Sequence, residues 1–250
     1  MLNGTLSTDN FRTSQMAMLK PKTLDRFADL LRTRALPSET IVKLTAISIG
    51  CHWHARQNAS IAPSESDAKR AKRRHDTEDI ALDFVLAFFG MLIQTAVEEL
   101  DEISLSNPLG DLDLHQHISA VLRRLLPALR IASKWIKLHL EYISRYLSTS
   151  NESLVTQIQS FWTRYKRLTS IFARLFPIAQ LPTLTDKLEE DIDMRGFVPL
   201  SRGMSAPDSY DKEANGHREA AHPNEEQLMR IADLQVDAQL LIQSEVSVSP

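Results

Sequence analysis

Basic residues recur at regular intervals in the second half of the chain. Residues 119–176 contain ten Lys and Arg against two acids, Glu141 and Glu152. Seven of the ten form two basic stripes with helical spacing, which are Arg123, Arg130, Lys134 and Lys137 in the first segment and Arg164, Arg167 and Arg174 in the second. Cations on one helix face neutralise phosphates and release counterions, which favours binding to nucleic acid of any sequence. The same spacing also fits solvated flanks whose aliphatic stems cover an apolar seam.

A second basic run, KRAKRR, lies between two predicted helices. It consists of Lys69, Arg70, Lys72, Arg73 and Arg74. Its composition fits a nuclear-import or nucleic-acid-binding patch, and equally a solvated charged loop. If the two basic stripes of residues 119–176 line one groove, reversing Lys134 and Arg167 together should weaken binding to single-stranded RNA or DNA. Reversing Lys69 and Arg70 should have a much smaller effect.

Patterns typical of catalysis are missing from the sequence. It has no phosphate-cradling Gly loop, no Gly-x-Ser-x-Gly elbow and no Cys/His pairing. Histidines two residues apart, in HWH at 52–54 and HQH at 115–117, point to different sides of a helix, and no further ligands complete a metal site. A two-metal nuclease needs opposed carboxylates, whereas the acids Glu189, Glu190, Asp191 and Asp193 are neighbours in sequence. We therefore predict no enzyme activity, no metal and no cofactor.

Composition indicates a globular, helical protein. The chain has 250 residues, 43% of them hydrophobic and 24% charged, with few glycines and no long alternation of β-branched residues. The single cysteine, Cys51, excludes an intramolecular disulfide and favours the nucleus or cytosol. The N-terminus lacks the features of a secretory signal. The most apolar run, residues 84–97, is short for a membrane span of roughly 20 residues, so we predict a core helix and no membrane partner.

The elements that position the basic residues are predicted to be helices throughout. Apolar residues alternate at spacings of three and four from Ile118 to Tyr146 and from Leu154 to Leu175, which indicates two long amphipathic helices. The short link between them predicts an antiparallel hairpin, and Pro127 is expected to kink or restart its first helix. The predicted fold class is all-α, a bundle of antiparallel helices with a long kinked helical hairpin.

The remaining boundaries follow from helix breakers and polar runs. Helices are expected to begin near Thr23, after the cap residue Ser38, and near Thr77. The predicted parts of the chain are a disordered N-terminus over 1–10, a helical domain over 11–204 with a basic loop at 58–76, a polar linker over 205–223 and a C-terminal helix over 224–245 that packs on the domain.

The segment LEEDIDMRGFVPL, residues 188–200, is unlike an ordinary interhelical loop, because a run of acids is followed by Arg-Gly-Phe and then Val-Pro-Leu. Its Gly and Pro both oppose helix continuation. It resembles the acidic segment and the Arg-Gly-Phe-x-Pro-Leu turn of the nucleic-acid-binding domain in one family. That family comprises the ever-shorter-telomeres telomerase regulators and the SMG-type nonsense-mediated mRNA decay factors. The matching positions are Leu188, Glu190, Asp191, Arg195, Gly196, Phe197, Pro199 and Leu200. LKPKTLDRFADLL, LPALRIASKWIKLH and SFWTRYKRLTSIF are similar to other family segments, so the resemblance spans residues 11–245.

The resemblance implies a non-enzymatic nucleic-acid-binding adaptor in nonsense-mediated mRNA decay or telomere maintenance. Its implied partners are single-stranded RNA or DNA and other decay or telomerase-complex proteins, and its implied location is the nucleus, with shuttling to the cytoplasm. We expect the chain to lack most of the family's N-terminal 14-3-3-like repeat domain and any PIN nuclease domain, and the usual Pro before Glu-Asp is Glu189 here. The alternative is a helical protein-interaction scaffold that keeps the fold without nucleic-acid binding.

The motif is expected to close the end of the hairpin rather than to carry chemistry. Gly196 would permit the sharp turn, Pro199 would block helix extension, and Phe197 and Leu200 would enter the bundle. If the Phe197 ring is buried, replacing it with Ala should cost about 3 to 5 kcal/mol.

Overall fold

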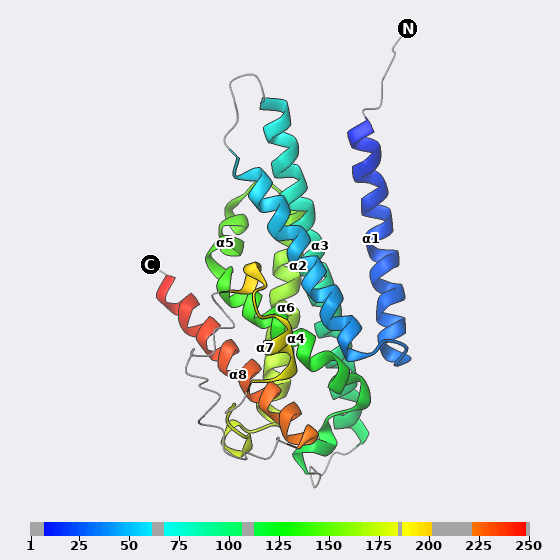
Figure 1. The fold of residues 1–250 in the computed structure, drawn as a ribbon, viewed down its shortest axis with the longest axis vertical. Helices are drawn as coiled ribbons and strands as arrows, with labels where there is room; N and C mark the ends of the chain where they lie inside the picture. The colour runs from blue at the N-terminus through cyan, green and yellow to red at the C-terminus, as the bar shows by residue number, and fades with distance from the viewer. Residues whose placement is uncertain (1–7, 62–67, 107–112, 185–186, 202–221, 249–250) are drawn as a thin grey trace.

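The fold is known from a computed structural model that describes residues 8–61, 68–106, 113–184, 187–201 and 222–248 (Figure 1). The described residues form α-helices and short 3₁₀ segments and contain no strand, which confirms the all-α prediction. The α-helices are α1 (Thr8–Arg32), α2 (Ser38–Ala59), α3 (Ala68–Ser106), α4 (Ala120–Leu138), α5 (Leu140–Arg145), α6 (Glu152–Leu175), α7 (Glu189–Asp193) and α8 (Pro223–Val248). The 3₁₀ segments are η1 (Leu114–His117), η2 (Tyr146–Ser148), η3 (Ile178–Gln180) and η4 (Val198–Leu200).

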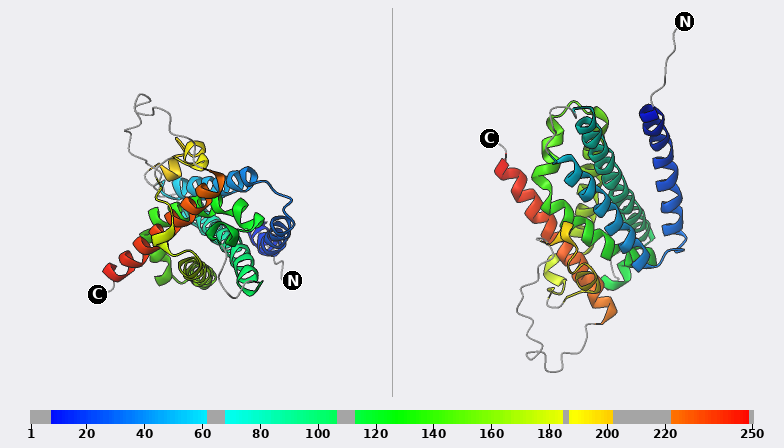
Figure 2. Two further views of the ribbon diagram at one scale, coloured as in Figure 1. Left: turned by 90° about the horizontal axis from the view of Figure 1, so that it is seen from below. Right: turned by 45° about the horizontal axis from the view of Figure 1, so that its top comes forward.

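Helix α3 is the centre of the bundle, with α1, α2, α4 and α6 packed around it (Figures 1 and 2). Its apolar run is almost wholly buried and includes Leu86, Phe89 and Leu92, each with no exposed surface. Among the described residues, α3 is also the one helix with the length and composition to cross a membrane, and 67% of that apolar window is buried inside the protein. The predicted core helix over residues 84–97 is therefore confirmed.

The helices that carry the predicted basic stripes are α4 and α6, which run in opposite directions (Figure 1). They begin at caps, where the Ser119 hydroxyl accepts from Leu122 N–H and the Asn151 side chain accepts from Leu154 N–H. Pro127 lies inside a continuous α4, and the break comes instead at His139, whose backbone is not helical (φ −116°, ψ 14°). Pro127 therefore does not restart the helix, as one form of the prediction had it. Helix α4 continues through Pro127 because proline removes only one backbone donor, and because the neighbouring side chains Leu126 and Ala128 are fully buried in the core.

Two predicted boundaries differ from the structure near the N-terminus. Helix α1 starts at Thr8 and continues through Pro21, so residues 8–10 are helical and the predicted start near Thr23 was wrong. Helix α3 starts at Ala68, so residues 68–76 form its first turns rather than a loop. The physical reason is that Ala, Lys and Arg are strong helix formers, which outweighs the charge repulsion that a basic run introduces.

Helix α8 lies obliquely across the outside of the bundle, over α4 and α7 (Figures 1 and 2). It matches the predicted C-terminal helix closely, while residues 205–221 of the predicted linker lie outside the described residues. It packs with apolar side chains such as Ile231, Leu234 and Leu241, each at most 4% exposed. The helix therefore belongs to the same core as α4 and α6, and its polar contacts with α4 bear directly on the basic stripe.

Candidate nucleic-acid interface

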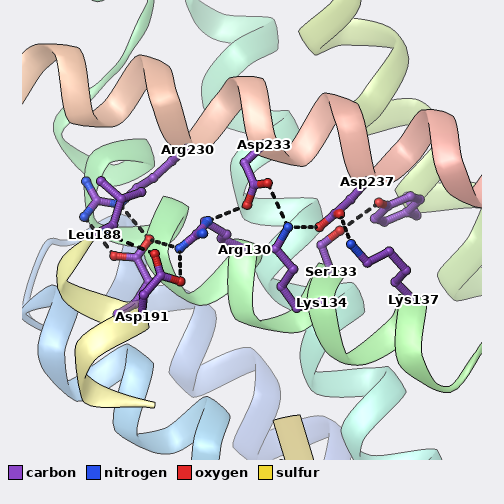
Figure 3. A network of polar contacts seen from close by, with 11 residues as sticks. Arg130, Ser133, Lys134, Lys137, Leu188, Asp191, Arg230, Asp233 and Asp237 are labelled. Carbon is purple, nitrogen blue, oxygen red and sulfur yellow. Dashed lines mark hydrogen bonds and ion pairs between the residues drawn. The ribbon is translucent and has the colours of Figure 1, made fainter. Parts of the chain in front are cut away.

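The basic stripe of α4 is covered by α8. Arg130 is 3% exposed and Lys134 is 7% exposed, and both face the α8 carboxylates Asp233 and Asp237 (Figure 3). Arg130 Nε lies 2.5 Å from Asp233 Oδ2, and Lys134 Nζ lies 2.8 Å from both Asp233 Oδ1 and Asp237 Oδ2. Lys137 Nζ continues the series at 2.5 Å from Asp237 Oδ1. Basic and acidic groups thus alternate along the contact between the two helices.

The acidic motif of α7 joins this series from the other side. Arg130 Nη1 lies 2.7 Å from Asp191 Oδ1 and 3.3 Å from Glu190 Oε1. Glu190, itself 2% exposed, accepts two hydrogen bonds from Arg230 of α8, at 2.9 and 2.8 Å. Two arginines therefore hold one buried carboxylate. We call the set Arg130, Lys134, Lys137, Glu190, Asp191, Arg230, Asp233 and Asp237 the α4–α8 network.

The charges of the network stabilise one another. Burial opposes the charge of Arg130, but Asp233, Asp191 and Glu190 more than offset it and raise the pKa of Arg130 above its usual value. Burial likewise disfavours the ionised form of Asp233, but the cations Arg130 and Lys134 hold the pKa of Asp233 below its usual value. Both groups are charged at neutral pH, and a buried charged network of this kind depends on every partner being present.

Arg123, the first member of the α4 stripe, anchors the start of α8. Its Nη1 donates to Asn224 Oδ1 at 2.6 Å, while Nη2 and Nε donate to the carbonyls of His115 and Ile118, each at 3.2 Å. The side chain is half-buried. Its hydrogen bonds are therefore used to join η1, α4 and α8.

The basic stripe of α6 faces α3 rather than α4. The Arg164 guanidinium lies over Gly90, where a Cβ atom would come within 2.8 Å of Arg164 Nη1. Arg167 Nη2 lies 2.5 Å from Asp101 Oδ2, in a pair that is more than a third exposed. Arg174 is exposed near the end of α6. Only this last residue points its charge into solvent without an ion-pair partner among the described residues.

The two stripes therefore do not line one groove. The side chains of Arg130, Lys134 and Lys137 are used in contacts with α7 and α8, and those of Arg164 and Arg167 in contacts with α3. The structure thus corrects the expectation that reversing Lys134 and Arg167 would test phosphate binding. Reversing Lys134 would instead break a buried ion-pair network.

The Arg-Gly-Phe turn closes the motif against α2 and the core. Gly196 has φ +79°, a left-handed conformation that favours glycine, and Leu200 has no exposed surface. Pro199 is buried in η4, and Arg195 is exposed. The Phe197 ring is only half-buried, with its edge 3.8 Å from the position of a Cβ on Gly50. Phe197 thus packs against the core as expected, but its burial is only partial because the ring rests on the surface of α2.

The acidic residues of the motif also have a local role. The Asp191 side chain accepts a hydrogen bond at 3.0 Å from the backbone N–H of Leu188, which is itself buried at 3% exposure. This bond satisfies one of the unpaired donors that precede a helix. Asp191 therefore both caps α7 and holds Arg130.

The basic run at the start of α3 is the most accessible of the predicted sites. Lys69, Arg70 and Lys72 are exposed and form no ion pair with the described residues. Arg73 is also exposed, and Arg74 is half-buried. Because these side chains project from a helix, their spacing is fixed in a way that a loop would not fix it.

One histidine of each pair, His52 and His117, is buried and takes part in packing. His52 Nε2 lies 3.1 Å from the Tyr142 hydroxyl, which donates to Glu78 Oε1 at 2.7 Å. Burial lowers the pKa of His52 to about 3, so its ring is neutral at physiological pH. His117 packs edge-on against Phe176. Among the described residues, no three His, Cys, Asp or Glu side chains gather in a way that could hold a metal ion.

Sequence reasoning missed the part that α8 plays. Asp233 and Asp237 are four residues apart on α8, and Arg130, Lys134 and Lys137 follow a matching spacing on α4. That complementary spacing was a usable signal, since oppositely charged residues at helical intervals pair across helix contacts. The sequence likewise identified the acids of residues 189–193 but did not predict their pairing with Arg130 and Arg230.

A family model described as the Est1 DNA/RNA binding domain matches residues 8–203 of the chain. No curated protein and no solved structure matches it. The matched region ends before α8, so the acidic side of the α4–α8 network comes in part from outside it.

Proposed function

Because the chain belongs to the Est1 DNA/RNA-binding domain family, we propose that it is a non-enzymatic adaptor that binds single-stranded RNA or DNA in nonsense-mediated mRNA decay or telomere maintenance. The match over residues 8–203 is the observation that carries this proposal, since the family is a binding module and not a catalytic one. The proposed partners include other decay or telomerase-complex proteins. The proposed location is the nucleus, with shuttling to the cytoplasm.

Accessible charge favours the start of α3 as the phosphate contact. Lys69 and Lys72 are exposed one helical turn apart, and their ammonium groups have no ion-pair partner among the described residues. Arg174 is the one member of the predicted stripes that shares these properties. A cation already bound to a buried carboxylate would have to give up that partner before it could hold a phosphate, whereas an exposed one only releases water and counterions.

The test is the binding of labelled single-stranded RNA and DNA of several unrelated sequences to the full chain, measured by fluorescence anisotropy over a salt series. We expect the logarithm of affinity to fall linearly with the logarithm of salt, by about 0.7 for each phosphate contact. Lys69→Glu with Lys72→Glu should weaken binding to every sequence and reduce that slope. Lys22→Glu with Arg26→Glu makes the same charge change on exposed residues of α1 and serves as the control.

A helical protein-interaction scaffold is the second candidate function. The observation in its favour is that most of the predicted basic stripe is paired within the chain, at Arg130, Lys134 and Lys137. Absence of oligonucleotide binding at low salt by the folded chain would contradict the adaptor proposal and favour the scaffold.

A further inference from the structure

Helices α2 and α3 line an open groove. It encloses about 1000 Å³ and lies between the second half of α2 and the first half of α3. On α2 its wall carries Ile47, Cys51, His54 and Asn58, which follow one another at intervals of four, three and four residues, and Ile61, just after the end of α2, extends it. Ile47 is 59% exposed and Ile61 is 54% exposed, which is unusual for isoleucine.

The α3 wall shows the same spacing with a different chemistry. Arg70, Arg73, Thr77, Ile80 and Phe84 line it at intervals of three, four, three and four residues. The wall is thus basic near the start of α3 and apolar further along. Two walls with helical seams of this kind, about 16 Å long on α2 and about 21 Å long on α3 at 1.5 Å per residue, are the shape into which a third helix packs.

The charge of the groove specifies its ligand further. Arginines line it at Arg70, Arg73 and Arg74, and no acidic residue is among the described residues that line it. The Nε atom of Arg74 is buried and has no hydrogen-bond partner among the described residues. A buried donor without an acceptor is costly, and a carboxylate from a partner would satisfy it.

We propose that the α2–α3 groove binds an amphipathic α-helix of another protein, with the apolar face of that helix on Ile47, Ile61 and Ile80 and its acidic residues on Arg70 and Arg74. Recognition of this kind uses anchor residues spaced by three, four and seven along the bound helix. The chain already contains one such arrangement, because α8 places apolar residues and aspartates on the basic and apolar face of α4.

Aliphatic lining favours a helix over a nucleic-acid strand in this groove. Bases stack on exposed aromatic side chains, whereas Phe84 is the one Phe, Tyr or Trp among the described lining residues and the exposed apolar side chains are isoleucines. The proposal does not depend on nucleic-acid binding by Lys69 and Lys72, which are outside the groove lining.

The experiment uses a displayed library of helical peptides of about four turns, with apolar anchors at helical spacing and charged positions randomised between acids and bases. The library is selected on the full chain. We expect enriched peptides to carry acids beside the anchors, and to bind the Ile47→Glu variant at least about 30-fold more weakly, as for loss of a central anchor. Leu105→Glu is the matched control, because Leu105 is 82% exposed at the far end of α3.

Cys51 provides a second readout without any mutation. It is the only cysteine of the chain, is exposed and lines the groove. A selected acidic peptide should slow its alkylation by N-ethylmaleimide, and the same peptide with its acids changed to lysine should not. Arg70→Glu should reduce the protection.

Four results would overturn the proposal. These are failure to enrich any peptide whose binding requires Ile47, enrichment of basic peptides, and protection of Cys51 by a single-stranded RNA oligonucleotide in place of the peptide. The fourth is slow alkylation of Cys51 in the chain alone, which would mean that another part of the chain or a second copy fills the groove. Loss of RNA binding by Lys69→Glu with Lys72→Glu leaves peptide binding intact in this account, so the two proposals fail separately.

Discussion

The molecule has two regions rich in arginine and lysine, and they differ in what surrounds the charges. In the α4–α8 network, Arg130 and Arg230 are each 3% exposed and are held by carboxylates from α7 and α8. At the α2–α3 groove, Arg70 is exposed and lies beside isoleucines that are also exposed. The same residue type thus forms part of the core in one region and of an open surface in the other.

The difference shows that charge phasing along a helix does not by itself identify a binding face. Arg130, Lys134 and Lys137 have the more regular spacing of the two regions, yet each is paired with an acid of α8. Desolvated ion pairs fix the register between elements and cost free energy when one partner is lost. Exposed cations keep their capacity for an external anion.

The largest predicted loss of stability follows from removing a buried carboxylate. Glu190→Gln removes the carboxylate held by Arg130 and Arg230, and we expect a loss of about 3 to 5 kcal/mol in the free energy of unfolding, because two buried guanidinium groups lose their common partner. Urea denaturation followed by circular dichroism measures it.

Glu141→Gln is the control for the same chemical change. Glu141 pairs with Arg145 on the surface of α5, where its side chain is 84% exposed, and we expect a change below about 1 kcal/mol. Equal effects of the two substitutions would mean that the α4–α8 network is not buried as described.

A smaller effect is expected at the turn that rests on α2. Phe197→Ala should lower the free energy of unfolding by roughly 1 to 3 kcal/mol, less than the loss expected from a fully buried Phe, because the ring is half-buried against Gly50. Phe161→Ala, at a position that is 1% exposed, is the comparison and should cost more. The reverse order of the two losses would contradict the placement of Phe197.

Acidic pH should lower the stability that the α4–α8 network contributes. The pKa of Asp233 is lowered in the folded state, so its ionised form contributes stability above the unfolded pKa of about 3.9, and that contribution is lost as the pH falls through the folded pKa. Urea midpoints measured from about pH 7 down to pH 3 should therefore fall less steeply in Asp233→Asn than in the parent chain. Parallel pH profiles would show that Asp233 titrates normally and is not paired.

The smallest effect on stability is expected at the open groove. Ile47→Glu should change the free energy of unfolding by no more than about 0.5 kcal/mol, since the side chain is 59% exposed. Thermal melting of this variant beside the parent checks it. A large loss of stability would mean that Ile47 is covered, in which case the groove is filled by the chain itself.

Local pattern was enough to predict the elements whose apolar faces repeat. The spacing of Leu122, Leu125 and Leu129 on α4, and of Ile158, Phe161 and Leu168 on α6, placed these helices correctly, because burial of one face imposes the period. Gly196 was likewise predicted in a turn, since its conformation is one that other residues avoid. The start of α3 differs from the prediction because the helix propensity of Ala, Lys and Arg outweighs the repulsion between the charges of the basic run.

The partners of the basic residues could not be predicted in the same way. Arg130 and Asp233 are separated by 103 positions along the chain, and Lys137 and Asp237 by 100. Their pairing depends on how α8 crosses α4, which is decided by apolar contacts such as those of Ile231 and Leu234 and not by any local signal. Site prediction from one sequence therefore identified the charged residues and not their exposure.

The distinction between buried, paired lysines and exposed ones is tested most directly by lysine acetylation followed by mass spectrometry. The reaction is run with and without a single-stranded RNA oligonucleotide. In the chain alone we expect Lys69 and Lys72 to react readily and Lys134 to be protected, because its ammonium group is buried between Asp233 and Asp237. Added RNA should protect Lys69 and Lys72 and leave Lys134 unchanged. Ready acetylation of Lys134 in the chain alone, suppressed by RNA, would show that α8 leaves the α4 stripe open to phosphate and would contradict this account.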